Sequence, residues 1–191
     1  MDLLRLKGKI QSLSSLTEQS WQLLSDSLHL QNFQQGEFLL KEGQVCESIF
    51  FVNQGYCRSF YVKDGNEIST QFHIENDLVS NTKSLVSGLR SDYWIVAGEN
   101  VEAIIFEKPA LLSLYRLSAE IESLGRKLLE QLLIKQEEHA DIFKLLSPTE
   151  RYQYLLRNHP VIVQRVPLTH IASYLGIARE TLSRIRSKRL S

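Results

Sequence analysis

Residues 168–186 read LTHIASYLGIARETLSRIR, and the interpretation of the whole chain starts from this stretch. The apolar side chains fit two short helices, because Ile171 and Leu175 share one face of the first and Leu182 lies on the second. Gly176 lies between them and can adopt the positive φ that turns the chain within a few residues. The spacing predicts a helix-turn-helix, in which the second helix contacts the major groove of DNA. A plain helical hairpin with an exposed basic face is the alternative interpretation.

The second helix of this motif carries polar side chains near its start. Arginine can donate to O6 and N7 of guanine, and glutamate can accept from N4 of cytosine. We therefore expect four residues to contact bases, namely Arg179, Glu180, Ser183 and Arg184. Other polar residues suit phosphates, which contribute affinity but no sequence information. These are Thr169, Thr181, Arg186, Lys188 and Arg189.

The charge distribution agrees with a polyanionic partner at this end of the chain. The formal net charge of the 191 residues is zero, yet residues 165–191 hold six basic side chains against one acidic side chain, Glu180. A basic tail on an acidic body favours nucleic acid as the partner, although such a run is also typical of a solvated face.

Two further segments precede the motif. The spacing of leucines predicts helix over residues 1–32. From residue 33 to 106, short β-branched and aromatic runs alternate with turn signals about every ten residues, which is typical of a small β-barrel or jelly roll. Asp64-Gly65-Asn66 lies between two such runs and predicts a β-hairpin.

A long helix is predicted over residues 118–146, with Ser118 as its N-cap. About 28 residues span roughly 42 Å, which is more than one small domain covers alone. We therefore expect the helix to pack against the barrel and against a second copy of the chain. The dimer helix residues are Ile121, Leu124, Leu128 and Leu132.

Ser147-Pro148-Thr149-Glu150 then has the pattern of a capping box with proline at the first helical position, so a new helix starts there. The predicted organisation is α+β. It comprises a β-roll or jelly-roll sensor domain over residues 1–117, a dimerisation helix over 118–146 and a helix-turn-helix domain over 147–191.

The motif IASYLGIARETLSRIR resembles the helix-turn-helix of the Crp–Fnr family, whose pattern is close to IAxYLGxxRETxSR. Residues 33–43 and 49–55 resemble the opening strands of that family's cyclic-nucleotide-binding barrel, and the ending LSRIR is similar to the Bacteroidetes-type branch. The resemblance implies a homodimeric transcription regulator that binds a palindromic site in double-stranded DNA and contacts RNA polymerase.

Two departures from the family pattern change these expectations. The glycine, glutamate and arginine that hold a cyclic phosphate in the family are missing, because the turn reads NDLVSN at residues 76–81 and Ser91 occupies the arginine position. We therefore do not expect cAMP to bind in the usual way. A different small effector would use the polar residues nearby, which are Arg58, Ser80, Asn81, Lys83, Arg90 and Ser91. The family's β-hairpin wing is absent or reduced to one strand around residues 163–167.

Other classes of protein fit less well. The five histidines are scattered singly, and no nucleophile motif or phosphate loop is present, so we expect neither an enzyme nor a metal site. Cys46 and Cys57 are too few for an iron–sulfur cluster and are expected to be packed thiols, with a redox switch as the alternative. A ligand-independent regulator with a scaffold barrel remains the main rival. No apolar run reaches membrane-spanning length, so we expect a cytoplasmic protein without a membrane partner.

Overall fold

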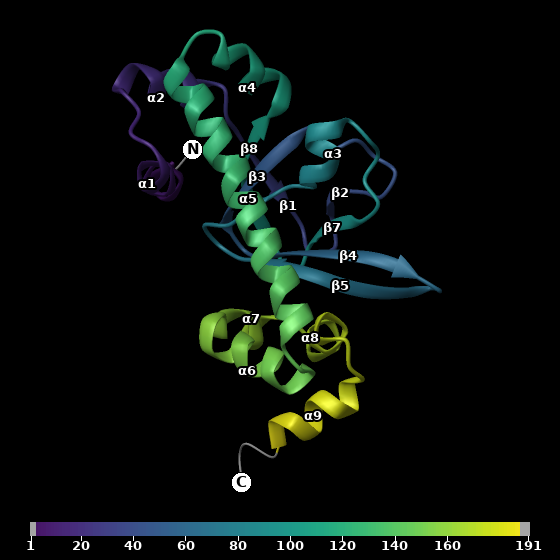
Figure 1. Cartoon of the computed structure of the whole chain (residues 1–191). Coiled ribbons are helices and arrows are strands. Elements are labelled where there is room, and N and C mark those ends of the chain that lie inside the picture. Colours follow the sequence, from purple (N-terminus) through teal and green to yellow (C-terminus); the bar gives the residue numbers. More distant parts are fainter. Residues whose placement is uncertain (1–2, 188–191) are drawn as a thin grey trace.

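The computed structural model describes residues 3–187. Figure 1 shows a β-barrel with helices at one end, a long helix running down its side, and a helical unit at the other end. The elements of the barrel region are α1 (Leu4–Leu13), α2 (Glu18–Asp26), β1 (His29–Phe33), β2 (Phe38–Leu40), β3 (Ser48–Gln54), β4 (Cys57–Lys63), β5 (Asn66–His73), β6 (Leu78–Val79), α3 (Thr82–Ser87), β7 (Trp94–Ala97), β8 (Val101–Glu107) and α4 (Lys108–Tyr115). The elements that follow are α5 (Ala119–Leu145), α6 (Pro148–Asn158), α7 (Pro160–Arg165), α8 (Leu168–Leu175) and α9 (Arg179–Ser187).

The predicted barrel is confirmed as two four-stranded antiparallel sheets, with strand orders β1-β8-β3-β6 and β2-β7-β4-β5. Buried aromatic and branched side chains such as Phe51, Phe106 and Ile95 fill its core. The prediction that the helical segment extends to residue 32 is wrong, because the helices end earlier. Residues from His29 onward form β1, because the edge of β8 supplies hydrogen-bonding partners for that backbone.

The predicted hairpin is confirmed between β4 and β5. Asp64 and Gly65 both have positive φ, at 52° and 76°, as a tight two-residue hairpin turn requires. The hairpin extends beyond the rest of the barrel, and β5 is the outermost strand of its sheet. One edge of β5 is therefore free to receive another element.

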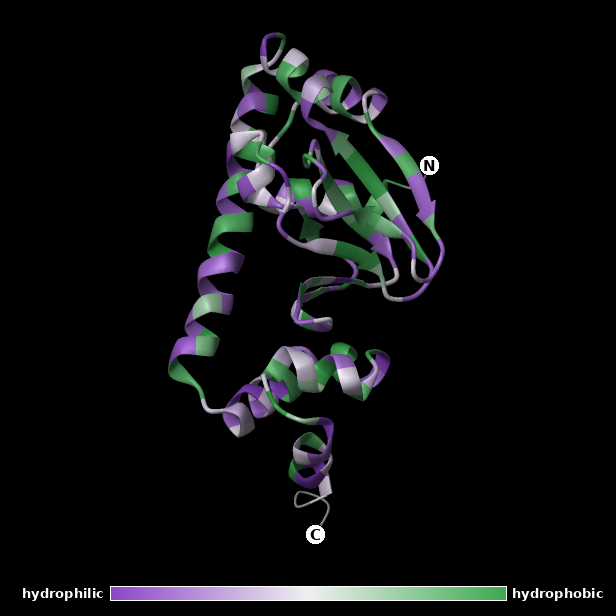
Figure 2. Cartoon of the chain, turned by 90° about the vertical axis from the view of Figure 1, so that its right-hand side faces the viewer, coloured by the Kyte–Doolittle hydropathy of each residue, from purple (hydrophilic) through white to green (hydrophobic). Residues whose placement is uncertain are grey.

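The long helix α5 begins at its predicted cap, where the Ser118 side chain accepts a hydrogen bond from the backbone N–H of Ile121. Green and purple segments alternate along this helix in Figure 2, as in an amphipathic helix. None of the helices within residues 3–187 is long and apolar enough to cross a membrane.

The four residues predicted for the dimer face of α5 do not lie on a free surface. Ile121, Leu124, Leu128 and Leu132 are at most 8% exposed, because they pack into the core of the chain's own barrel. That part of the prediction is corrected. The apolar side chains that α5 leaves exposed in its middle are Leu133 and Ile134.

The helical unit after α5 starts with the predicted capping box, in which Ser147 and Glu150 exchange hydrogen bonds. A strand around residues 163–167 is not observed. Helix α7 occupies most of that stretch, because Pro160 suits a first helical turn and Ile162 is buried among the other helices. No strand follows β8 within the described residues.

Arg151 on α6 fixes the arrangement of this unit through three backbone carbonyl groups. Its guanidinium donates to Phe143 O at 2.8 Å and Leu175 O at 3.1 Å, and Nε donates to Leu146 O at 2.9 Å. These carbonyls lie at the C-terminal ends of α5 and α8, where helices leave acceptors unpaired and favour a positive charge. One side chain thus joins three helices.

We expect Gly55→Ala to destabilise the barrel more than Gly65→Ala. Both glycines have positive φ, so alanine costs about 1–2 kcal/mol of backbone strain at either position. A Cβ at Gly55 would also lie 2.4 Å from the backbone oxygen of Asn100, whereas nothing lies within 4 Å at Gly65. The overpacking adds about 1–3 kcal/mol. Urea unfolding of both variants tests this, and equal midpoints would contradict it.

Candidate nucleic-acid interface and its contacts with the barrel

Helices α8 and α9 form the predicted helix-turn-helix. Gly176 ends α8 with a φ of 71°, as the sequence indicated, and its N–H caps the helix by donating to Ser173 O. Ile171 and Leu175 of α8 and Leu182 of α9 are buried together, so α9 is held against α8 by its apolar face. The opposite face of α9 is left exposed.

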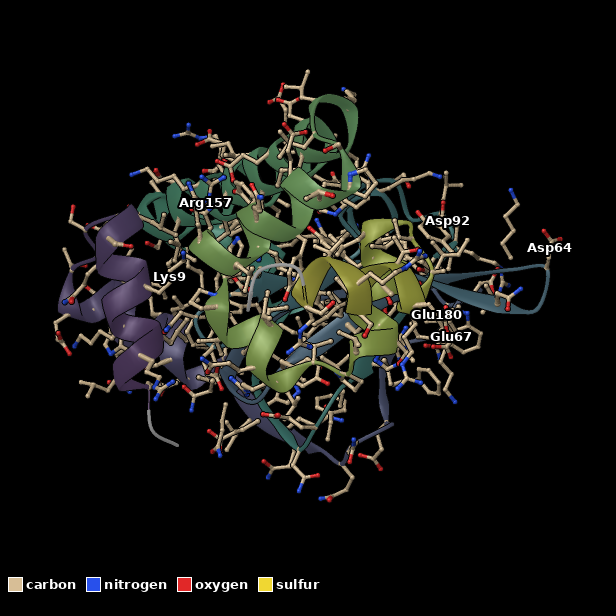
Figure 3. All side chains as sticks on the ribbon, turned by 90° about the horizontal axis from the view of Figure 1, so that it is seen from below. Lys9, Asp64, Glu67, Asp92, Arg157 and Glu180 are labelled. Carbon is tan, nitrogen blue, oxygen red and sulfur yellow. The ribbon has the colours of Figure 1, made fainter. Side chains whose placement is uncertain are left out.

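All four residues predicted to contact bases lie on that exposed face of α9. They are Arg179, Glu180, Ser183 and Arg184. Helix α9 lies at the end of the molecule opposite α4 (Figure 1), and Figure 3 views the chain from that end, with Glu180 labelled. Within residues 3–187, neither arginine forms an ion pair, so both guanidinium groups are available to another molecule.

The residues predicted to contact phosphates are partly described by the structure. Thr169 and Arg186 are exposed, and Thr181 is half-buried and accepts a hydrogen bond from Arg184 at 3.4 Å. Lys188 and Arg189 lie outside the described residues. Contact of this surface with DNA stays a prediction.

The helix-turn-helix is docked on the barrel through the free edge of β5. Ser173 on α8 accepts a hydrogen bond from the N–H of Ser69 at 3.0 Å and donates to the carbonyl of Glu67 at 2.9 Å. One serine hydroxyl thus satisfies two backbone groups of an edge strand, in the way that a neighbouring strand would. No sequence signal marks Ser173 for this contact, because its partners lie more than 100 positions away.

Aromatic side chains join the same two units to α5. Tyr174 of α8 contacts Phe72 of β5, His139 of α5 and Phe143 of α5, with ring centroids 5.2, 5.5 and 5.4 Å apart. Burial lowers the pKa of His139, whose Nε2 is buried without a hydrogen-bond partner among the described residues. A neutral imidazole fits this apolar environment, and a charged one would not be compensated there.

An ionic contact completes the docking. Arg165 of α7 donates to both carboxylate oxygens of Glu75, at 2.8 and 3.0 Å, and also to Glu99. Glu75 accepts in addition from the N–H of Gly55 at 2.9 Å. Burial alone raises the pKa of Glu75, but the hydrogen bonds from Arg165 and Gly55 outweigh it, so the net pKa lies below the usual value. Sequence reasoning missed these residues, because only the fold brings them together.

The six residues predicted for an effector pocket are not brought into one cavity. Lys83 pairs with Asp92, and Arg90 donates to Gly43 O at the surface. Arg58, Asn81 and Ser91 are buried and Ser80 is partly buried, and all four are bonded to other groups of the barrel. The bonds join Arg58 with Glu67 and Ser69, Ser80 with Ser48, and Asn81 with Ser91 and Ser84.

The hollow that includes Ser80 has a volume of only about 20 Å³. His73 and Tyr93 occupy the surrounding space, and such a volume holds about one water molecule. The prediction of an effector site at these six residues is therefore corrected, because they do not line one cavity and their polar groups are already bonded, most of them to other residues of the barrel. Cys46 and Cys57 are both buried free thiols.

Comparison with known sequences finds relatives of the barrel and of the chain. Residues 30–118 match the family of the cyclic nucleotide-binding domain. The transcriptional activator protein FnrA of Stutzerimonas stutzeri is 28% identical over 165 residues, covering 78% of this chain. The transcriptional activator protein anr of Pseudomonas aeruginosa is equally similar. The chain spans 66% of the length of these two relatives.

Solved structures share the fold. FixK2 from Bradyrhizobium japonicum has a TM-score of 0.68 at 20% identity, over 84% of this chain and 83% of that protein. The catabolite activator protein of Thermus thermophilus has a TM-score of 0.55 at 19% identity, over 91% of this chain and 84% of that protein. Both similarities extend beyond the barrel into the helices that follow it.

We expect His73 to make the barrel sensitive to acid. Burial lowers the pKa of His73 to about 3, and Nε2 lies 3.0 Å from the Ser59 hydroxyl. The unfolded chain takes up this proton near pH 6.5, so the stabilising contribution is complete above pH 6.5 and is lost as the pH falls toward 3.

The test compares thermal unfolding midpoints of the wild type and His73→Gln between pH 7.5 and pH 5. The stability advantage of the wild type should shrink as the pH falls. Exposed His29→Gln serves as the control, with a midpoint that follows the wild type throughout. Parallel curves for His73→Gln and the wild type would contradict the assignment.

Proposed function

We propose that this chain, a relative of the Crp–Fnr transcription regulators that carries a cyclic nucleotide-binding domain, is a sequence-specific DNA-binding transcription regulator. The exposed face of α9, on which Arg179 and Arg184 form no ion pair within residues 3–187, is the observation that carries the proposal. The curated relatives are named transcriptional activators, so the proposal includes contact with RNA polymerase and no enzymatic activity. A regulator of this kind meets its DNA in the cytoplasm.

The proposed roles follow the chemistry of each side chain. Arg179, Glu180 and Arg184 project from the first two turns of α9, the part of a recognition helix that meets base edges. Arg186 lies at the end of the helix and suits the phosphate backbone. The proposed domains are a sensor barrel up to residue 117, a linking helix to residue 146 and a DNA-binding unit from residue 147.

We further propose that two copies pair along α5. A palindromic site needs two recognition helices about 34 Å apart, one for each half-site. Leu133 and Ile134 are 55% and 49% exposed in the middle of α5, and adjacent exposed apolar side chains of this kind are typical of a contact surface. Pairing there would leave the barrel contacts of the opposite face of α5 intact.

Control by cAMP inside the barrel is not part of the proposal. The hollow near Ser80 is too small, and the buried guanidinium of Arg58 is already paired with Glu67. A larger, open cavity of about 530 Å³ lies beside residues 39–50, where the Arg90 guanidinium donates to Gly43 O. At the hollow near Ser80, a cyclic phosphate would therefore be buried without a free compensating charge.

Selection of binding sites from random DNA at two salt concentrations tests the function. A palindrome should be recovered, and Arg179→Ala should relax specificity at one base pair, losing about 1–3 kcal/mol of discrimination there. Arg116→Ala removes an exposed arginine that follows α4 and should leave the recovered site unchanged. Salt-sensitive binding without a recovered sequence would contradict the proposal.

The dimer is tested separately by sedimentation. Leu133→Asp combined with Ile134→Glu should convert a dimer into a monomer, because two charges would be buried in the interface without partners. The affinity for DNA should fall when the dimer is lost. Val161→Asp, which alters a 37% exposed apolar residue on α7, should stay dimeric. A double variant that remains dimeric would show that pairing uses another surface.

A further inference from the structure

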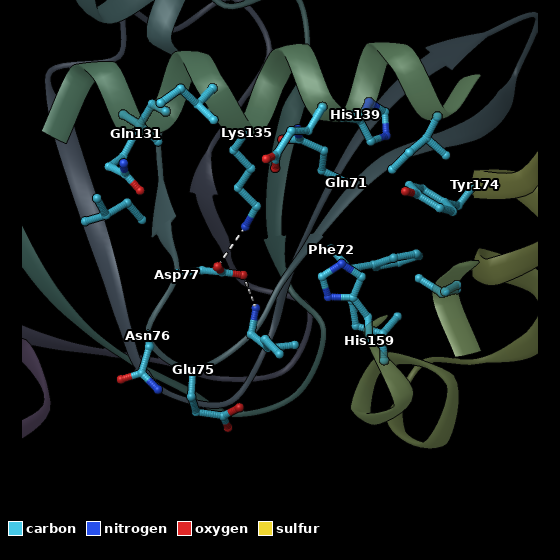
Figure 4. A pocket seen from close by; sticks show the side chains of 18 of the residues that line it. Gln71, Phe72, Glu75, Asn76, Asp77, Gln131, Lys135, His139, His159 and Tyr174 are labelled. Carbon is cyan, nitrogen blue, oxygen red and sulfur yellow. Dashed lines mark hydrogen bonds and ion pairs between the residues drawn. The ribbon is translucent and has the colours of Figure 1, made fainter. Parts of the chain in front are cut away.

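A cavity of about 480 Å³ lies where the barrel, α5 and the DNA-binding unit meet (Figure 4). Residues 71–78 of the barrel form one wall, residues 131–142 of α5 form the second, and side chains of α6, α7 and α8 form the third. Its volume falls in the range of small-molecule sites. It lies between the units and adjoins the small hollow near Ser80, with which it shares Gln71, Leu78, Leu132 and Lys135.

The walls offer aromatic surface from each side. Phe72 comes from β5, His139 from α5, Tyr174 from α8 and Tyr154 from the middle of α6, and His159 is the residue that follows α6. Tyr154 and His159 contact each other, with ring centroids 6.0 Å apart. Planar rings are the groups that stack best on such surfaces.

The charges inside the cavity are already balanced. Lys135 pairs with Asp77 at 2.8 Å, as Figure 4 shows, and Glu75 is bound by Arg165. Two further charged residues, Lys9 and Glu138, have opposite signs and form no ion pair within residues 3–187. Lys9 and Glu138 contribute one charge of each sign, so an anionic ligand would find no net positive charge to neutralise it.

Hydrogen-bonding groups remain available in the same walls. The side chains of Gln71, Asn76 and Gln131 have no hydrogen-bond partner among the described residues. Nε2 of His139 is buried and equally without a partner. An amide both donates and accepts, so these groups match the edge of a ring that carries both kinds of polar atom. A buried polar atom without a partner points to a missing one.

We propose that this cavity binds an uncharged heteroaromatic compound that regulates the DNA-binding unit. The regulatory half of the inference rests on the proposed function. A ligand in the cavity touches the barrel, α5 and α8 at once, so it stabilises whichever arrangement of these units fits it best. The position of α8 determines that of α9, and the ligand thereby changes the affinity for DNA.

Titration calorimetry with adenosine and cyclic AMP tests the site. The two compounds share a base and a sugar, and cyclic AMP adds a negative charge. Adenosine should bind, and cyclic AMP should bind at least about tenfold more weakly. Absence of adenosine binding, or tighter binding of cyclic AMP, would overturn the inference.

A pair of variants on α6 places the ligand in the cavity. Tyr154→Ala removes a half-buried aromatic wall and should weaken adenosine binding about tenfold. Gln153→Ala alters an exposed neighbour outside the cavity and should leave the affinity unchanged. Hydrogen exchange confirms that both variants are folded. Equal adenosine affinity in the two variants would overturn the location.

The regulatory half is measured as the affinity for the selected DNA site with and without adenosine. We expect a change of at least about threefold that Tyr154→Ala abolishes. DNA binding that adenosine leaves unchanged would overturn the regulation and leave the proposed function standing. Adenosine binding by a chain that recovers no DNA site would overturn the proposed function and leave the site standing.

Discussion

The contact of Arg165 with Glu75 and Glu99 is the constraint on which the arrangement of the chain depends. Glu75 lies in the turn between β5 and β6, and Glu99 lies in the turn between β7 and β8. Arg165 ends α7, so one guanidinium ties two turns of the barrel to the DNA-binding unit. Glu75 also holds Gly55, at the turn between β3 and β4. Three turns are thus linked through Glu75 and Arg165, and bidentate geometry makes the contact between these two residues specific in orientation.

The remaining contacts between the units follow from this one. With α7 anchored, α8 lies along the free edge of β5, where Ser173 satisfies two backbone groups and Tyr174 enters the aromatic cluster with Phe72 and His139. Helix α9 then projects away from the barrel. The cavity of about 480 Å³ exists because these contacts hold α6 and α7 beside α5 without filling the space between them.

The sequence predicted the features that depend on neighbouring residues. The cap at Ser118, the capping box at Ser147, the hairpin at Asp64-Gly65 and the turn at Gly176 all rest on local chemistry, and the structure has each of them. Helix α7 was missed, because its short apolar run fits a strand equally well until its burial against the other helices is known. The start of β1 was missed for a similar reason, since its partner β8 lies about 70 residues away.

The functional residues could likewise be predicted only where they depend on neighbouring residues in the sequence. The exposed face of α9 follows from the spacing of apolar residues in one short motif, so its candidate residues could be named in advance. The residues of an effector pocket could not be named in advance, because a pocket depends on which polar groups find partners elsewhere in the fold. Arg58 and Asn81 are buried, as residues of a pocket would be, yet each is bonded within the barrel. The apolar stripe of α5 was expected to pack against both the barrel and a second copy, and the four residues assigned to the dimer face pack into the chain's own core.

Hydrogen exchange of Arg165→Met tests the central constraint most directly. If Arg165 holds the DNA-binding unit on the barrel, the amide of Ser69, which donates to Ser173, should exchange at least about tenfold faster in the variant. The amides of β3 and β8 in the barrel core should be unchanged. Unaltered exchange at Ser69 would contradict the account, because the unit would then be docked without the ionic contact.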